Sequence, residues 1–276
     1  MVTPVSEKFA SLSTHATGHL AVLAVLAVAS QDQVNRLTFL LEGKDVLLRI
    51  VKERFGVVVI QKVLPFLQLK TLVSIAGSLQ GQIVKIGCDR HGSLFLQEFF
   101  RLSIVNKEVV DVLLEEVMDS LSILAYDDVA TWLVQEVVKL EGESSQVYLT
   151  RVAYWLVKNM QAVLMDAAGT SLARMLVQLL MSRMICGQVS RWSQILERLV
   201  SAMMNTMVVQ DGEELPLLIV AAEHPCGHNV VLELAANKDC LVETKDRMVE
   251  MLNKHKTRLE VGPIGCLVVK GMQGWL

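Results

Sequence analysis

The fold is decided by a short phrase that recurs along the chain, first seen clearly as Phe55-Gly-Val-Val-Val-Ile-Gln-Lys62. It returns as His91-Gly-Ser-Leu-Phe-Leu-Gln-Glu98 and as Val129-Ala-Thr-Trp-Leu-Val-Gln-Glu136. With fainter copies added, a small residue recurs at the pivots Gly18, Gly56, Gly92, Ala130, Gly169, Gly227 and Gly265. The pivots are 38, 36, 38, 39, 58 and 38 residues apart. Such a period is typical of stacked repeat proteins, in which each repeat buries its apolar face only against its neighbours.

The composition favours helices in a folded chain. Of the 276 residues 52% are hydrophobic and 20% charged, and only five are proline. The long segments between the prolines are rich in Leu, Val, Ala, Met and Glu, which predicts helices. The five cysteines are an odd number without a CxxC motif, a pattern of reducing compartments. We therefore expect an intracellular protein and not a secreted one. The sequence carries no targeting signal that distinguishes nucleus, nucleolus and cytoplasm.

The most apolar stretch is Leu20–Ala29, ten residues that are too few to span a bilayer. It predicts a buried helix in phase with the repeat. A signal peptide is the alternative, because Ala27–Ser30 resembles a cleavage site, but one Lys and one Glu precede the stretch instead of a positive cluster. We expect no membrane partner.

Each repeat can be divided into a short apolar helix, a turn, a second helix just after the pivot and an amphipathic third helix. We expect the small pivot to avoid crowding of the neighbouring repeat. The third helices are predicted at Gln33–Leu41, Leu69–Ile75, Lys107–Met118, Val147–Asn159, Trp192–Met204 and Thr244–Asn253. The long gap predicts extra sequence at 205–215, with a loop at Asp211-Gly212. Pro216 then begins the next helix. The last repeat lacks its third helix, as expected of an atypical cap or of a fragment.

These residues resemble the Pumilio repeat, whose signature is similar to aromatic-Gly-x-x-Val-Ile-Gln-Lys. The best match is Leu79–Phe100, followed by Arg54–Leu64 and by Asp128–Val138, where Ala130 replaces the glycine. The resemblance implies an all-α, curved α-solenoid of about six to seven three-helix repeats, forming a single domain over residues 1–276. It also implies a non-catalytic protein that binds single-stranded RNA on its concave face. Such a protein would act in RNA processing or post-transcriptional regulation, and the chain looks most like the divergent, nucleolar members.

In that family two side chains four residues apart on each second helix contact a base edge, and the residue after the first stacks between bases. Residues so spaced share a helix face, amides can bond a base edge, and flat groups can stack on bases. By resemblance the edge pairs are Val57 and Gln61, Ser93 and Gln97, Thr131 and Gln135, and Thr170 and Arg174. The residues in the stacking position are Val58, Leu94, Trp132 and Ser171. Trp132 is the only aromatic one, and packing in the core is an alternative role for it.

The charge of the chain is uneven. Residues 44–107 hold ten Lys and Arg against four acids, a net charge of +6, so the remainder carries −9. The basic section is either a footprint for a polyanion such as RNA or a set of ordinary solvated helix faces. A scaffold that binds other proteins is the competing hypothesis, favoured by the net charge of −3, by Val58 and Leu94, and by thirteen methionines.

Nothing in the sequence predicts catalysis, a cofactor or a metal. No nucleophile motif, P-loop or dinucleotide fingerprint is present, so we expect a non-enzyme. The segment His224-Pro-Cys-Gly-His228 carries three potential ligands without an evident fourth, and the repeat turn already requires Pro225 and Gly227. His15 and His19 lack the Glu of a zinc-protease motif. We expect a monomer.

Overall fold

The computed structural model describes residues 4–38, 43–103, 107–140, 143–185, 189–236 and 242–272. Within these ranges the chain is helical apart from turns and one two-stranded hairpin, which confirms the all-α prediction. The chain divides into two compact units, residues 1–142 and 143–276. The fourth repeat crosses this boundary, because its first two helices lie in the first unit and its third helix opens the second.

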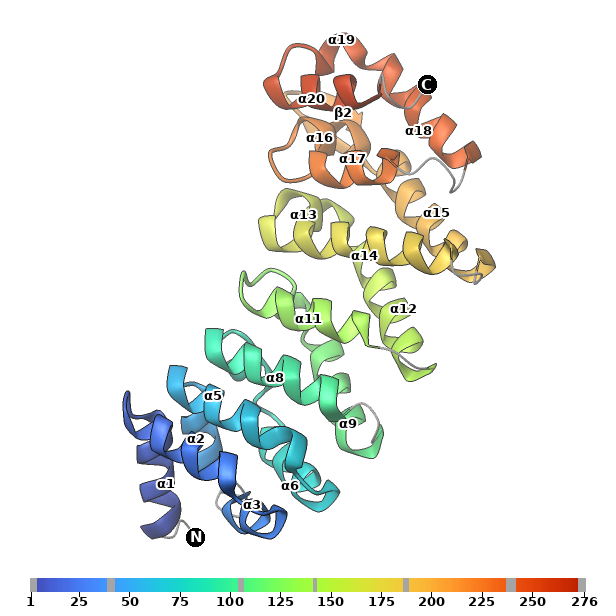
Figure 1. Ribbon diagram of the computed structural model, residues 1–276. Coiled ribbons are helices and arrows are strands. Elements are labelled where there is room, and N and C mark those ends of the chain that lie inside the picture. The colour runs from blue at the N-terminus through green and yellow to red at the C-terminus, as the bar shows by residue number, and fades with distance from the viewer. Residues whose placement is uncertain are drawn as a thin grey trace. The chain divides into compact units, whose positions relative to one another are not determined.

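The first unit is a stack of helices in the predicted order (Figure 1). The first helices of its repeats are α1 (Pro4–Thr14), α4 (Lys44–Val51), α7 (Ile83–Gly87) and α10 (Leu121–Leu124). The second helices are α2 (Gly18–Val28), α5 (Arg54–Val63), α8 (Arg90–Ser103) and α11 (Ala130–Lys139). The third helices are α3 (Gln31–Thr38), α6 (Leu69–Leu79) and α9 (Lys107–Asp119), and a 3₁₀ turn, η2 (Leu64–Phe66), follows α5. The second helices lie side by side, since α2 packs on α5, α5 on α8 and α8 on α11.

The second unit repeats the pattern with one interruption. It contains α12 (Glu143–Lys158), α13 (Met160–Met165), α14 (Ala167–Ile185), α15 (Val189–Asn205), β1 (Met207–Gln210), β2 (Glu213–Pro216), α16 (Leu217–Glu223), α17 (His228–Ala236), α18 (Val242–Lys254), α19 (Lys256–Leu259) and α20 (Pro263–Met272). Here α14 packs on α17, and α17 packs on α20. The third helices α15 and α18 cover the ranges predicted from the sequence, and α12 begins four residues earlier and ends one residue earlier than predicted.

The core lies between successive layers of helices. In α8 the side chains of Phe95, Phe99 and Phe100 are fully buried, and the ring centroids of Phe95 and Phe99 are 5.8 Å apart. In the second unit Trp192 on α15 is also fully buried. Aromatic side chains of this size remove large apolar areas from water, which stabilises the contact between layers.

The pivot glycines permit a close approach within one repeat. A Cβ added to Gly56 would lie 2.1 Å from the carbonyl oxygen of Ile50, and one added to Gly92 would lie 2.4 Å from that of Ile86. Ile50 and Ile86 belong to the first helix of the same repeat. The prediction that the small residue avoids the neighbouring repeat was therefore wrong, because the tight contact is between the first and second helices of its own repeat.

A side chain three residues before the pivot closes the turn in five repeats. The Oδ1 atom of Asp89 accepts the backbone N–H of Gly92 at 2.8 Å, and Asp127 and Asp166 accept the equivalent N–H groups. These bonds satisfy backbone donors that a helix start leaves open. His15 and His224 use ring Nδ1 in the same place, with Nδ1 of His224 3.2 Å from the backbone nitrogen of Cys226. Two of the histidines singled out in the sequence, His15 and His224, thus have a structural role at the turn.

The extra sequence before Gly227 is only partly a loop. Helix α14 has 19 residues where α8 has 14, and α15 has 17 where α9 has 13, so about half of the excess lengthens helices. The predicted loop is a β-hairpin, with Asp211 (φ 54°) and Gly212 (φ 83°) as its turn. Two positive φ angles are the geometry that joins strands of native twist. Pro216 ends β2, and α16 begins one residue later than predicted.

The apolar run in α2 is not buried as predicted. Only Val22 is buried in this helix, and Val28 is 84% exposed. Among the described helices α2 has one second helix, α5, beside it, whereas α5 and α8 have two. No single described helix has the length and apolar character needed to cross a bilayer. Residues 7–14 of α1 and helix α2 reach that length and apolar character only together, and they are bent by 109° at their junction.

Candidate nucleic-acid interface

The first edge position is almost closed to solvent in three repeats of the first unit. Val57, Ser93 and Thr131 are 4%, 1% and 2% exposed. They lie one residue after the pivot, where α5, α8 and α11 pack against each other. The Oγ atom of Ser93 lies 3.4 Å from the backbone carbonyl oxygen of Val129, to which it donates a hydrogen bond. The side chain of Ser93 thus joins α8 to the N-terminus of α11.

The stacking position is open in each of the same helices. Val58, Leu94 and Trp132 are 38%, 45% and 56% exposed. Large apolar side chains at a repeated exposed position cannot be explained by the core of the first unit. Trp132 therefore does not have the alternative role of a core residue that the sequence left open.

The three glutamine side chains differ in their exposure to solvent. Gln61 and Gln97 are half-buried, but Gln135 is only 3% exposed, so the expectation of an exposed amide fails there. The Nε2 atom of Gln97 donates to Oγ of Ser93 at 3.1 Å, which aligns the amide along α8. Its carbonyl oxygen accepts no hydrogen bond from the described residues. Gln97 can therefore still accept a bond from an incoming group.

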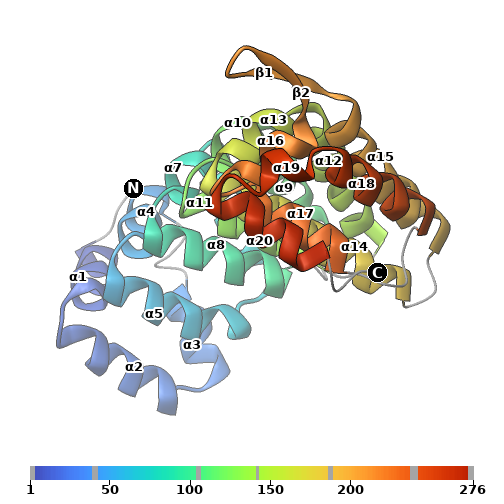
Figure 2. The ribbon, with the colours of Figure 1, turned by 90° about the horizontal axis from the view of Figure 1, so that it is seen from above.

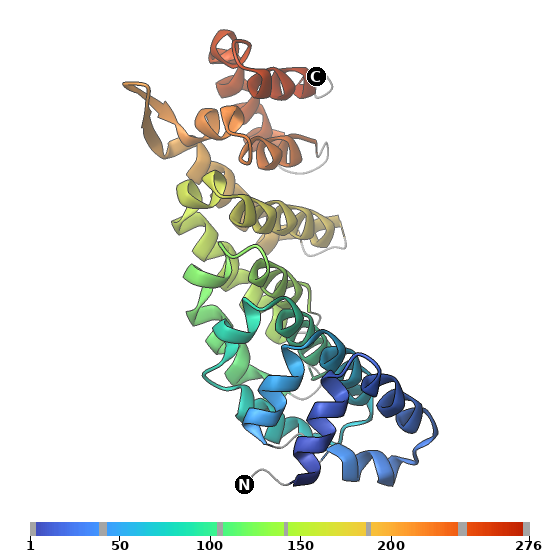
Figure 3. The ribbon, with the colours of Figure 1, turned by 90° about the vertical axis from the view of Figure 1, so that its left-hand side faces the viewer.

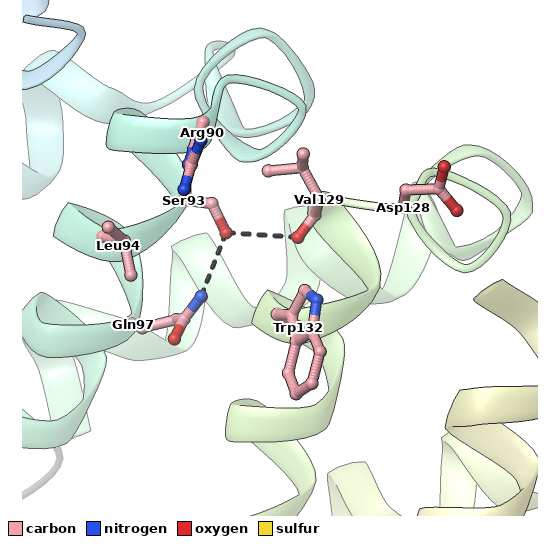
Figure 4. A pocket seen from close by; sticks show the side chains of 7 residues that line it. All are labelled: Arg90, Ser93, Leu94, Gln97, Asp128, Val129 and Trp132. Atoms are coloured by element: carbon pink, nitrogen blue, oxygen red, sulfur yellow. Dashed lines mark hydrogen bonds between the residues drawn. The ribbon is translucent and has the colours of Figure 1, made fainter.

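A groove of about 510 Å³ brings several of these side chains together between α8 and α11. It is lined by Arg90, Ser93, Leu94, Gln97, Asp128, Val129 and Trp132. Figure 4 shows Leu94 and Trp132 on opposite sides of the groove, one from each helix, with the amide of Gln97 between them. The groove thus combines two apolar walls with a hydrogen-bonding group at its base, which is the pattern of ligand sites in general.

Arg90 is a groove residue that the sequence argument missed. It lies two residues before its pivot, and Arg54 occupies the same offset one repeat earlier. Both are exposed, so they place two cations at the start of neighbouring second helices. The recurrence of arginine two residues before the pivot could have identified this position from the sequence. Asp128 has this offset in the next repeat and reverses the sign of the charge.

Glu98 of α8 and Glu136 of α11 form ion pairs with basic side chains. Arg101 donates to Glu98 and to Oε2 of Glu136 at 2.9 Å, and Nζ of Lys139 lies 3.1 Å from Oε1 of Glu136. Burial alone would raise the pKa of Glu136, but the hydrogen bonds from Arg101 and Lys139 outweigh it and lower that pKa. The same contact with Glu136 raises the pKa of Arg101. The ion pairs reduce the repulsion that these carboxylates would exert on an anion.

In the second unit the predicted residues of the fifth repeat are arranged differently. Thr170 is 5% exposed and donates to the carbonyl oxygen of Val163 at 3.1 Å. Ser171 is half-buried. Arg174 is exposed and pairs with Glu233 of α17, with 2.9 Å between Nε and Oε2. This repeat offers no apolar wall at the stacking position.

No group of three or more potential metal ligands occurs among the described residues, including the segment from His224 to His228. The residues of the groove also lack a nucleophile paired with a base. Binding by stacking, hydrogen bonding and charge is the chemistry that this set of side chains can perform.

Comparison with solved structures identifies the fold. PUF-8 in complex with PBE-RNA aligns with a TM-score of 0.78 and 12% identity, over 98% of this chain and 72% of that one. The Puf3 RNA-binding domain bound to a Cox17 RNA recognition sequence aligns with a TM-score of 0.74 and 16% identity, over 96% and 73%. Human Puf-A aligns with a TM-score of 0.72 and 14% identity, over 98% and 57%. The chain has the Pumilio-repeat fold.

Sequence comparison alone does not reach this result. No family model matches the chain, and no curated protein matches it in sequence. The Pumilio-repeat fold is therefore preserved here with few of the residues that identify it elsewhere.

Proposed function

We propose that this Pumilio-repeat protein binds single-stranded RNA, without catalysing a reaction, along the face formed by α5, α8 and α11. The observation that carries the proposal is the groove, where Leu94 and Trp132 flank the amide of Gln97. RNA processing or post-transcriptional control inside the cell is the setting in which such binding would act. Solved proteins of this fold bound to RNA, such as PUF-8 and the Puf3 domain, support the class of ligand.

The groove fits an unpaired base. A base has two apolar faces and a polar edge, and in single-stranded RNA both are accessible. Its faces contact Leu94 and Trp132, and its edge donates to the free carbonyl oxygen of Gln97. Stacking of a base on an aromatic side chain is worth about 1–3 kcal/mol by alanine substitution. An exocyclic amino group is the natural donor to this oxygen, so the groove favours bases that carry one.

Positive charge beside the groove suits the phosphates. Arg54 and Arg90 lie at equivalent positions of α5 and α8, one repeat apart, as successive phosphates along a strand require. Two such contacts predict a slope of about −1.4 in a plot of log affinity against log salt concentration. Binding should then weaken about sevenfold between 50 and 200 mM salt.

A second candidate is a scaffold that binds protein through the same face. The exposed side chains of Val58 and Leu94 favour it, because aliphatic groups pack on protein as well as on bases. An apolar protein interface depends little on salt, whereas RNA binding through arginine weakens steeply. Salt dependence therefore separates the two functions.

The test is fluorescence anisotropy of the purified chain with a randomised single-stranded RNA pool and with an A-rich oligomer, at two salt concentrations. We expect Trp132→Ala to weaken binding about 5- to 150-fold. Tyr154→Ala is the matched control, because Tyr154 is 46% exposed on α12 and does not line the groove. Equal affinity of the wild type and the Trp132 variant, or no binding of either RNA at low salt, would reject the proposal.

A further inference from the structure

The hairpin of the second unit is the one β element among the described residues, and it interrupts an otherwise helical repeat. It projects away from the helices of its unit (Figures 2 and 3). β2 packs against α15 and α16, and β1 packs against α16. In a two-stranded sheet each strand keeps one edge that the other strand does not cover. Insertions of this kind in repeat proteins commonly serve recognition.

The register shows which backbone groups of β1 face outward. Gln210 pairs with Glu213 next to the two-residue turn, and Val208 pairs with Leu215. Two-residue turns close on a hydrogen-bonded pair, and the bonded pairs then alternate. The N–H of Leu217 donates to the carbonyl oxygen of Thr206 at 2.7 Å, which continues this alternation. The N–H and C=O groups of Met207 and Val209 therefore point to the open edge.

The two strands differ in how their edges are protected. Native proteins block free edges with charge, proline or a bulge, because an open edge pairs with any extended chain. β2 carries Glu213, Glu214 and Pro216. β1 has the sequence Met-Val-Val-Gln, without a charge or a proline. Val209 is 74% exposed and Met207 46%, on the same face of the strand.

An ion-pair network fixes the hairpin in place. The guanidinium group of Arg258, in α19, donates to Glu213 at 2.8 Å and to Oε1 of Glu223 at 2.8 Å. Asp211 at the turn lies 3.8 Å from the same group. These contacts join the turn and the start of β2 to α16 and α19, and a preorganised hairpin lowers the entropic cost of docking.

The charge around the hairpin is negative. Asp211, Glu213, Glu214 and Glu223 carry four negative charges against the single positive charge of Arg258. Glu214 is exposed and directly opposite Val209 in the register. It has no ion pair with the described residues. A ligand that runs along β1 therefore meets a negatively charged neighbourhood.

We propose that β1 is a docking edge for an extended peptide of a partner protein, which adds to the hairpin as a third strand. The peptide carries apolar side chains that pack on Met207 and Val209, alternating with Lys or Arg on the opposite face of the sheet, beside Glu213, Glu223 and the turn. Main-chain hydrogen bonds give affinity in such strand addition, and the alternating side chains give specificity. This site is independent of the RNA groove, and it holds whether or not the chain binds RNA.

The experiment starts from a phage-displayed library of random nine-residue peptides selected on the full chain. We expect enrichment of sequences that alternate Val, Ile or Thr with Lys or Arg. Synthetic copies are then titrated by fluorescence anisotropy. The variant Val209→Pro removes the outward N–H but leaves the bonds between β1 and β2, so it should weaken binding about tenfold or more. The matched variant Val209→Thr keeps the N–H and the strand propensity, and should stay within about threefold of the wild type.

A second measurement guards against a misfolded hairpin in the proline variant. Two sets of alternate peptide residues are N-methylated in turn. Methylation of the set whose N–H groups face β1 should abolish binding to the wild-type chain, and methylation of the other set should leave binding intact. Failure to enrich any peptide, equal binding by Val209→Pro, or equal effects of methylating either set would overturn the proposal. So would sedimentation showing that β1 pairs with a second copy of this chain in a dimer that Val209→Pro dissolves.

Discussion

Replacing the pivot Gly92 by alanine tests the contact that defines the repeat. The new Cβ would lie 2.4 Å from the carbonyl oxygen of Ile86 and 2.7 Å from its Cγ2 atom. The oxygen belongs to the backbone, so α7 and α8 must move apart. Overpacking of this kind costs about 1–3 kcal/mol. Alanine stabilises a helix by about 0.5–1 kcal/mol relative to glycine, so we expect a net destabilisation of about 0.5–2 kcal/mol.

Gly77 provides a matched control with the opposite sign. It lies inside α6, it is exposed, and no heavy atom of the described residues lies within 4 Å of an added Cβ. Gly77→Ala should therefore stabilise the chain by about 0.4–1 kcal/mol, mainly by restricting the unfolded state. The assay is urea unfolding followed by circular dichroism. A Gly92 variant as stable as the wild type, or two variants that shift in the same direction, would refute the reasoning.

Two further predictions concern stability. Thr170→Val should lower the free energy of unfolding by about 0.5–1.5 kcal/mol, since the buried hydroxyl loses its bond to Val163, while Thr170→Ser should retain most of it in urea titrations. The pKa of Glu136 is lower in the folded chain than in the unfolded chain. The ionised carboxylate therefore stabilises the fold above the unfolded-state pKa, and this stabilisation is lost as the pH falls through the folded-state pKa. Glu136→Gln should therefore lose less stability than the wild type between pH 5 and pH 3, measured as urea midpoints; parallel losses would contradict this.

The sequence predicted the repeat well because its signal is periodic and local. The spacing of the pivots located the second helices, and apolar periodicity located the third helices to within a few residues at most ends. The hairpin was missed although Asp211-Gly212 is a strong turn signal. Its flanking strands have only four residues each, and the helical context on both sides favoured a plain loop.

The depth of each side chain could not be predicted, because it depends on the neighbouring helix. Ser93 and Gln97 share a face of α8, yet Ser93 is buried by α11 and Gln97 is not. Gln135 has the same offset as Gln97 and is nevertheless buried. Likewise, the apolar sequence of α2 indicated a core helix, but only α5 lies beside it in the stack of second helices. The position of a residue relative to the pivot predicts the direction in which its side chain points, whereas the packing of the adjacent repeat determines how exposed that side chain is.

Photo-crosslinking tests the RNA proposal most directly. A single-stranded RNA pool containing 4-thiouridine is irradiated with the full chain, and the crosslinked peptides are identified by mass spectrometry. The account predicts crosslinks in α8 and α11, centred on Leu94 and Trp132, that disappear when unlabelled RNA competes. Crosslinks confined to other helices, or none at low salt, would contradict the assignment of the groove as an RNA site.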